Sequence, residues 1–309
     1  MNLVSRALTT AFRWAPRLPE PTVRAAADAA AFATWLARGS GVQQLEKNLA
    51  TIRPQAASHT RSGSRRALRN YFRYYAEALY LPALTPALID ARVVVNPPAE
   101  LREHLQEKSA IVVLGHLGNW DLAGAWASRH LAPVLTVAEH LQPEELFHEF
   151  VRLREDVGMS IIPLDDGNVF RQLISRSRQQ RHLVCLLADR DLTRSGMPAT
   201  ITDQPARVAA GPAALAAVTG MPLYFVGSRH IRLAGERARR AGTRWGMALE
   251  FFGPLTTSAR GEDAVADLTT QWTGLLSDYL RAHPLHWHML QPVFDADLDL
   301  ARIREKQGA

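Results

Sequence analysis

The chain has 309 residues but contains only one cysteine. Because Cys185 cannot form an intrachain disulfide, a small secreted domain held by disulfides is excluded, and a reducing compartment fits. Cys185 lies in an apolar run at 183–187, so we expect a buried, inert thiol. Lysine is equally scarce: of the 36 basic residues, three are lysines and 33 are arginines. This bias, together with many alanines, first indicates a GC-rich genome.

Long hydrophobic runs are also missing. The longest uncharged stretch, 208–228, is interrupted by Gly-Pro at 211–212 and by Gly-Met-Pro at 220–222, which divide it into a short helix and a strand. Arg6 and Arg13 interrupt the apolar residues near the amino terminus, so we expect no signal peptide. The sequence therefore predicts an intracellular protein whose membrane contact is peripheral.

The net charge is +6, and 47% of the residues are hydrophobic. This hydrophobic share is enough for a sizeable core and excludes intrinsic disorder. The length favours one or two domains. Residues 229–244 hold six arginines and one glutamate. They are interpreted either as a solvated loop or as a patch that faces anionic lipid headgroups or nucleic acid.

The hydrophobic pattern of the first 90 residues has helical spacing. We expect helices at 3–15, 23–37, 43–52 and 62–81, and the last carries many tyrosines. Apolar helices with arginines and aromatic residues can pack in a core or lie in a bilayer interface. We expect one of the first two helices to touch the membrane.

From about residue 91 the pattern changes to strands that alternate with helices. Residues 110–115 form a continuous apolar run, typical of a strand buried on both faces. Further strands are expected at 134–138, 160–163, 182–188, 223–229 and 244–252, the last pairing with the strand before it. The sequence predicts an α/β class with a central mixed, largely parallel sheet flanked by helices. Residues 1–90 are interpreted as a helical membrane-associating segment and 91–309 as the core, in one continuous unit.

Residues 115–121 carry the most informative chemistry. His116 follows a buried strand, where catalytic groups of open α/β sheets gather, and Asp121 opens a helix that Asn119 can cap. A histidine held in this way can accept a proton from an attacking hydroxyl, and a carboxylate on its other nitrogen can fix its tautomer. The spacing alone also fits a strand-end histidine followed by a capping aspartate without catalytic function.

These residues, His-Leu-Gly-Asn-Trp-Asp, resemble the HxxxxD motif of the lysophospholipid acyltransferase superfamily, in the branch of the bacterial lipid A biosynthesis acyltransferases. Six further stretches resemble the actinobacterial phosphatidylinositol mannoside acyltransferases. They lie in order at 41–50, 71–82, 137–144, 188–196, 209–216 and 287–292, so the resemblance covers nearly the whole chain.

The resemblance implies a reaction and three catalytic residues. An enzyme of this family moves a fatty acyl group, typically palmitoyl, from acyl-CoA to a hydroxyl of the mannose on position 2 of inositol in a phosphatidylinositol mannoside. His116 is expected to be the general base and Asp121 its orienting partner. Asp189 stands where the family has a glutamate in a charge relay with the histidine. Since aspartate is one methylene shorter than glutamate, we expect Asp189 to contact His116 either directly or through a bridging water.

The resemblance also implies substrate contacts. Glu139 and Arg154 match positions that line the acceptor site, where a glutamate can bind sugar hydroxyls and an arginine can bind phosphate. Arg190, or backbone N–H groups near residues 195–196, could stabilise the oxyanion. There is no Gly-x-Ser-x-Gly elbow, so direct attack on the thioester is simpler than a serine acyl-enzyme. Acyl-CoA is a co-substrate, and no other cofactor is expected.

Three histidines, His283, His286 and His288, lie close together in the sequence. Pro284 breaks the geometry of a metal site and no carboxylate joins them, so we expect no metal. His140 and His148 are expected on a solvated face. The expected location is the cytoplasmic face of the cell membrane, with the inner leaflet, acyl-CoA and the glycolipid as partners and no nucleic acid.

Three alternatives stay open. One is a related lipid acyltransferase with another acceptor or an acyl carrier protein donor. Another is a catalytically inactive lipid-binding protein, for which the departure at Asp189 is the hint. The last is a basic nucleic-acid-binding module, which predicts salt-sensitive binding and no loss when His116 is replaced.

Overall fold

The computed structural model describes residues 14–298 except 55–58, 141–143, 166, 192 and 194–195. The helix predicted at 3–15 therefore lies almost wholly outside the described residues. Within the described part of the chain, no helix combines the length and the apolar character needed to cross a membrane.

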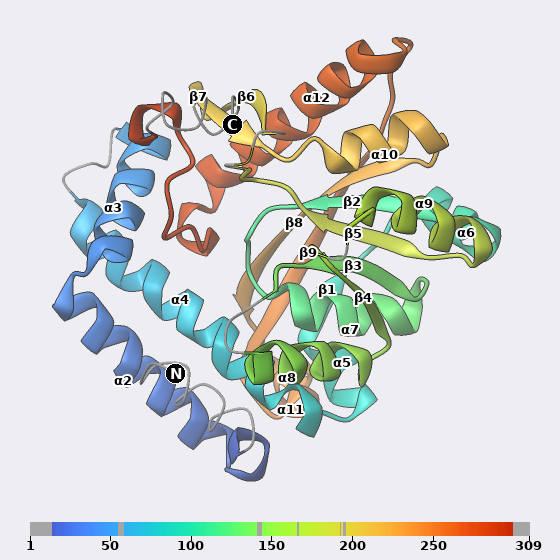
Figure 1. Cartoon of the computed structure of the whole chain (residues 1–309). Coiled ribbons are helices and arrows are strands. Elements are labelled where there is room, and N and C mark those ends of the chain that lie inside the picture. The colour runs from blue at the N-terminus through green and yellow to red at the C-terminus, as the bar shows by residue number, and fades with distance from the viewer. Residues whose placement is uncertain are drawn as a thin grey trace.

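The amino-terminal region consists of helices, as the hydrophobic pattern predicted. They are η1 (Ala15–Arg17), α2 (Glu20–Ala37), α3 (Ser40–Ile52) and α4 (Thr60–Tyr80). Each of the three α-helices starts two or three residues before its predicted start. Helix α2 includes Pro21 in its first turn, where a proline is tolerated because its missing N–H would have no intrahelical partner. The helix can therefore start before the proline. In Figure 1 these blue helices lie together beside the sheet.

The centre of the molecule is a seven-stranded sheet in the order β1-β9-β8-β2-β5-β3-β4. The strands are β1 (Val93–Val95), β2 (Ala110–Leu114), β3 (Val134–Ala138), β4 (Met159–Pro163), β5 (Leu183–Leu187), β8 (Leu223–Arg232) and β9 (Trp245–Leu255). All neighbouring pairs are parallel except β8 and β9, which are antiparallel. The predicted α/β class with a largely parallel mixed sheet is confirmed, as is the pairing of the last two strands.

Helices flank both faces of this sheet (Figure 1). In the core, α7 (Trp120–His130) and α8 (Glu144–Glu155) pack with residues of one face, whereas α9 (Val169–Gln179), α10 (Gly211–Thr219) and α12 (Gly261–Ala282) pack with residues of the other. Strand β2 shows why: Ile111 and Val113 belong to the cluster with α10 and α12, and Val112 belongs to the cluster with α7. Side chains alternate along a strand, so a strand covered on both faces is apolar throughout.

Several elements were not predicted. They are α5 (Pro86–Arg92), α6 (Ala99–Glu107), α11 (Gly235–Ala241), the short strand β1, and a separate hairpin of β6 (Met197–Ile201) and β7 (Gln204–Val208). Short 3₁₀ helices also occur at η3 (Leu81–Ala83), η4 (Pro284–His286) and η5 (Asp295–Asp297).

The arginine-rich stretch at 229–244 is not a loop, so that interpretation is wrong. It contains α11 between the ends of the two long strands β8 and β9. Arg237 on this helix donates to the carbonyl oxygens of Asp90, Ala91 and Val93. The side chains of Arg239, Arg240 and Arg244 are exposed.

Candidate active site

His116 lies two residues beyond the end of β2, in a turn that other segments hold tightly. The His116 carbonyl accepts from the His288 N–H (2.8 Å), and the Gly118 N–H donates to the His286 carbonyl (3.1 Å). Gly118 has φ +59°, and a Cβ there would lie 2.6 Å from Ser228 Oγ. The turn therefore requires glycine both for its backbone conformation and for space.

The partner of the His116 imidazole is Asp189. His116 Nδ1 lies 2.6 Å from Asp189 Oδ1, and the His116 backbone N–H donates to Oδ2 over 2.9 Å. Trp287 Nε1 donates to the same Oδ2 over 2.7 Å. Asp189 is fully buried, whereas the His116 side chain is 32% exposed. Thus a direct contact forms despite the shorter side chain.

The electrostatics of Asp189 favour its ionised form. Burial acts to raise its pKa, but the charge of His116 and the hydrogen bonds from His116 and Trp287 outweigh burial, so the pKa of Asp189 lies below its ordinary value. An ionised carboxylate on Nδ1 holds the proton at that nitrogen and leaves Nε2 free to accept one. This is the arrangement that a general base requires.

Asp121, the predicted orienting partner, has different contacts. Its Oδ1 accepts from Arg154 Nε over 2.7 Å and its Oδ2 from the Tyr74 hydroxyl over 2.9 Å. The hydrogen bond of the His116 ring that the described structure contains goes to Asp189 instead. The charge of Asp121 also raises the pKa of Arg154 against the opposing effect of burial. Geometrically, Asp121 orients Arg154.

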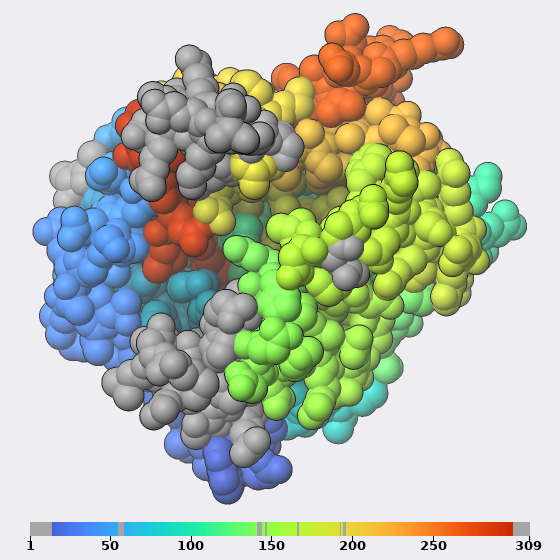
Figure 2. All heavy atoms as spheres, in the orientation of Figure 1, coloured from blue at the N-terminus to red at the C-terminus, as the bar shows by residue number. Residues whose placement is uncertain are grey.

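A cavity of about 370 Å³ opens beside His116 and Trp120. It extends between α7 and the sheet, because α7 presents small residues to it: Ala123, Gly124 and Ala127. Figure 2 shows the surface hollowed between α4, the red carboxyl-terminal segment and the green part of the chain. The cavity thus has the titratable side chain of His116 at its mouth and an apolar interior.

The walls of this cavity are the strand residues that point toward α7. On β5 these are Leu183, Cys185 and Leu187, and on β2 they are Val112 and Leu114. Strands rise about 3.3 Å per residue, so the β5 wall is about 13 Å long. Cys185 therefore contributes to the cavity wall rather than to a closed core. Burial raises the pKa of its thiol to about 12, so the thiol is protonated near neutral pH.

The other predicted substrate residues surround the mouth. Arg154, Glu139 and Arg190 all line the cavity, and Glu139 is exposed. Arg190 makes no hydrogen bond or ion pair with any residue that the structure describes, so its guanidinium is available to a ligand. Of the predicted backbone donors, Ser195 is outside the described residues. The Gly196 N–H donates to the Thr193 carbonyl over 3.1 Å and is already used.

The carboxyl-terminal histidines support the turn. His288 Nε2 lies 2.8 Å from the Gly118 carbonyl oxygen, and His286 Nδ1 accepts from the His230 N–H over 3.3 Å. Burial, with the nearby histidines, lowers the pKa of His286 to about 2 and that of His288 to about 3.

No group of three or more potential metal ligands occurs among the described residues. His140 is ion-paired to Glu144 and Asp165 near the surface.

Two residues of the site had no predicted role. Trp287 binds Asp189, and Tyr74 binds Asp121 and packs against Trp120 in a tilted arrangement, with ring centroids 4.1 Å apart. Both lie in sequence stretches that carried the family resemblance, at 71–82 and 287–292. Their position in these stretches was the available signal. It did not predict that Trp287 contacts Asp189 or that Tyr74 contacts Asp121, because these residues are far apart in the sequence.

Sequence comparison supplies the family. A profile of the family described as bacterial lipid A biosynthesis acyltransferase matches residues 7–295. The chain belongs to this family.

Curated relatives narrow the comparison. A phosphatidylinositol mannoside acyltransferase of Mycolicibacterium smegmatis is 35% identical over 271 residues, covering 86% of this chain and 84% of the relative. Proteins of the same name from two strains of Mycobacterium tuberculosis are 35% identical over 295 residues, covering 92% of this chain and 86% of theirs. The resemblance read from the motifs is confirmed, and the protein is an acyltransferase of lipid biosynthesis.

Proposed function

We propose that this protein transfers a long-chain fatty acyl group, palmitoyl, from acyl-CoA to a mannose hydroxyl of a phosphatidylinositol mannoside. The observation that carries the proposal is the pair of His116 and Asp189 at the mouth of an apolar cavity. The names of the relatives support the acceptor. We expect the protein to work at the inner leaflet of the cell membrane.

In this mechanism the mannose hydroxyl binds at His116 Nε2. As its oxygen attacks the thioester carbonyl, its proton passes to Nε2, and Asp189 stabilises the imidazolium. The tetrahedral intermediate then expels the coenzyme A thiolate, which takes the proton from Nε2. The ester is formed and the imidazole is regenerated. Arg190, which has no described partner, is suited to stabilise the oxyanion or to bind a phosphate of the donor.

The cavity supports a long chain over a short one. Its α7 and sheet walls are apolar, and the wall along β5 extends about 13 Å from the mouth inward. Burying methylene groups there is favourable by about 0.8 kcal/mol each, so a longer chain binds more tightly until the cavity is full. The acceptor would lie outside the cavity, beside Glu139 and Arg154.

The amino-terminal helices support a membrane location. On α2, Phe32 and Leu36 are exposed, and Trp14 and Leu18 are exposed just before it. The guanidinium of Arg65 lies 5.1 Å from the Phe32 ring centre. Aromatic and aliphatic side chains beside arginines suit a bilayer interface with anionic lipids.

The test is mass spectrometry of products formed from palmitoyl-CoA and a purified phosphatidylinositol mannoside. The expected product carries one additional palmitoyl ester on mannose. Parallel reactions with palmitoyl acyl carrier protein, and with other glycolipid acceptors, address the alternative donors and acceptors. Transfer only from the carrier protein would overturn the donor, and transfer only to another lipid would overturn the acceptor. No transfer with any pair would support the inactive lipid-binding alternative.

The proposed preference for a long acyl chain can be tested separately with a variant of the cavity wall. Ala127→Leu places a larger side chain in the cavity wall, so the ratio of rates with palmitoyl-CoA and decanoyl-CoA should fall by about 10-fold. Ala234→Leu makes the same change at an exposed position before α11 and should leave this ratio unchanged. An equal ratio in both variants would mean that the acyl chain does not occupy this cavity.

A further inference from the structure

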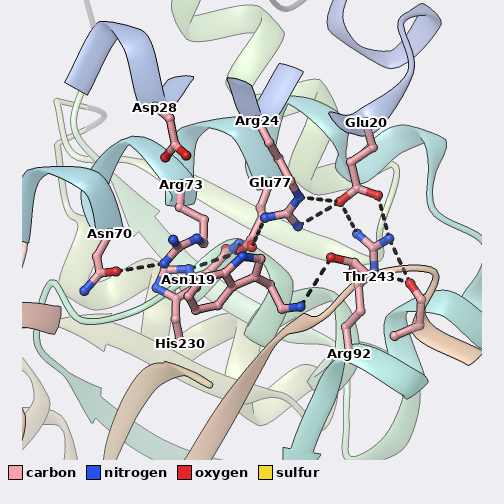
Figure 3. Close-up of polar contacts among 12 residues, drawn as sticks. Glu20, Arg24, Asp28, Asn70, Arg73, Glu77, Arg92, Asn119, His230 and Thr243 are labelled. Atoms are coloured by element: carbon pink, nitrogen blue, oxygen red, sulfur yellow. Dashed lines mark hydrogen bonds and ion pairs between the residues drawn. The ribbon is translucent and has the colours of Figure 1, made fainter. Parts of the chain in front are cut away.

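Glu77 on α4 is a buried carboxylate that the proposed mechanism does not use. Figure 3 shows it at the centre of a polar network. Its Oε2 accepts from Asn119 Nδ2 over 3.0 Å and lies 3.2 Å from His230 Nε2, and its Oε1 accepts from Arg24 Nη1 over 3.1 Å. These partners come from the start of α7, from β8 and from α2, which are distant in the sequence. Glu77 therefore joins three parts of the fold.

Asn119 connects this network to the catalytic turn. It is the N-cap of α7, where its Oδ1 accepts from the Leu122 N–H over 2.9 Å. Its amide group donates to Glu77 at the same time, so both ends of the side chain are held. Asn119 lies between His116 and Asp121. Serine, threonine or aspartate can also cap a helix, but only asparagine among them offers an amide donor to a carboxylate.

The network keeps Glu77 ionised. Burial acts to raise its pKa, but His230 and Arg24 outweigh burial and lower the pKa of Glu77 to about 2. Arg24 is in turn held by Glu20, which also binds Arg92. Helix α2 thus contributes a positive charge to the carboxylate that holds Asn119.

We propose that Glu77 is a positioning residue for acyl transfer. Through Asn119 it fixes the turn that carries His116 against the first turn of α7, and α2 supports this arrangement through Arg24. The effect of Glu77 on the rate of acyl transfer rests on the proposed function. Its effect on the hydrogen exchange of backbone amides can be measured whether or not that function is correct.

The decisive experiment exchanges the donor and the acceptor of this hydrogen bond. Asn119→Asp keeps a capping carboxylate but sets it against Glu77, so kcat should fall about 10- to 100-fold with little change in KM for the donor. Glu77→Gln alone leaves Arg24 and His230 without their carboxylate and should also lower kcat. In the double variant, which combines Glu77→Gln with Asn119→Asp, the introduced amide donates to the introduced carboxylate. Its kcat should return to within about 3-fold of the wild type.

Hydrogen exchange measures the same contact without activity. In Asn119→Asp, amides at 116–124 should lose protection, while those of α12 should not change. The double variant should restore the protection. A double variant no better than the product of the single changes would overturn the proposal, as would unchanged exchange at 116–124 in Asn119→Asp. If the wild type transfers no acyl group, the proposed function fails, and the exchange pattern still decides the role of Glu77.

The contribution of α2 is tested by Arg24→Gln, which should lower kcat about 3- to 10-fold and loosen the same amides. Arg69→Gln is the matched control, because it removes an exposed ion pair between the same two helices, to Asp28. It should change kcat by less than about 2-fold. Equal losses in the two variants would show that α2 acts by general packing, and would overturn its role through Glu77.

Discussion

Two buried aspartates lie near the turn that carries His116, and their surroundings differ. Asp189 faces a partly exposed histidine and accepts from Trp287, whereas Asp121 faces Arg154 and Tyr74. Both are nearly inaccessible to solvent, at 0% and 1% exposed. The first can support a proton transfer, because an imidazole is able to gain and lose a proton during the reaction. The second can only orient, because an arginine stays charged.

The function that each carboxylate can have therefore depends on the group that it touches. Spacing in the sequence favours Asp121, which is five residues from His116. The three-dimensional contact favours Asp189, which is 73 residues away. Four measurements test whether the two aspartates act in these separate ways.

The largest effect is expected for His116→Ala. Without the imidazole no base is left to accept the hydroxyl proton, so kcat should fall by about 10⁴-fold while donor binding and thermal stability stay close to the wild type. Single-turnover assays and thermal unfolding check this. His130→Ala, at the other end of α7, is the control. Near-normal turnover of His116→Ala would rule out the histidine as base.

Asp189→Asn should be nearly as severe. The new amide oxygen can replace Oδ2, which accepts from both the His116 backbone N–H and Trp287. The amide nitrogen then faces Nδ1 and forces the proton onto Nε2, so the base is lost while the fold is kept. We expect kcat to fall about 10³-fold.

Asp203→Asn is the matched control for this change, since Asp203 is in an exposed ion pair with Arg281 and should show no effect. An unchanged rate in Asp189→Asn would remove Asp189 from the reaction. The claim that Asp189 and Asp121 have different functions would then be wrong.

Asp121→Asn should act by another route. Arg154 loses its countercharge and its fixed direction, so kcat/KM for the acceptor should fall about 10- to 100-fold, mostly through KM. The free energy of unfolding should fall by roughly 2 kcal/mol. Steady-state kinetics with varied acceptor and urea unfolding measure both. If kcat fell as far as in Asp189→Asn, the two aspartates would not have separate functions.

The smallest effect concerns pH. Because the folded pKa of Asp189 is below its ordinary value of 3.8, its ionisation stabilises the fold above that pH. This contribution is lost as the pH falls through the lower folded pKa. The difference in unfolding free energy between the wild type and Asp189→Asn should therefore shrink as the pH falls below 3.8. Urea unfolding across this range checks it, and a difference independent of pH would contradict an ionised Asp189.

Much of the fold could be predicted from the sequence. The strand at 134–138 has its predicted limits, because its apolar pattern is strong and its ends carry clear signals. Strand β1 was missed since three residues carry too little pattern. Helix α11 was missed because its arginines suggested a solvated loop, whereas Arg237 in fact binds backbone carbonyls at the end of α5.

For the site, the residue types follow from the sequence: a histidine after a buried strand, a capping asparagine, an aspartate at the start of a helix, and the family to which they belong. Which carboxylate serves the histidine depends on how the strands are ordered in the folded sheet. Strands β2 and β5 are parallel neighbours with Leu114 opposite Leu187, so the residues two positions beyond, His116 and Asp189, meet at the same edge of the sheet. Strand order is a property of the packed sheet, and no local pattern contains it.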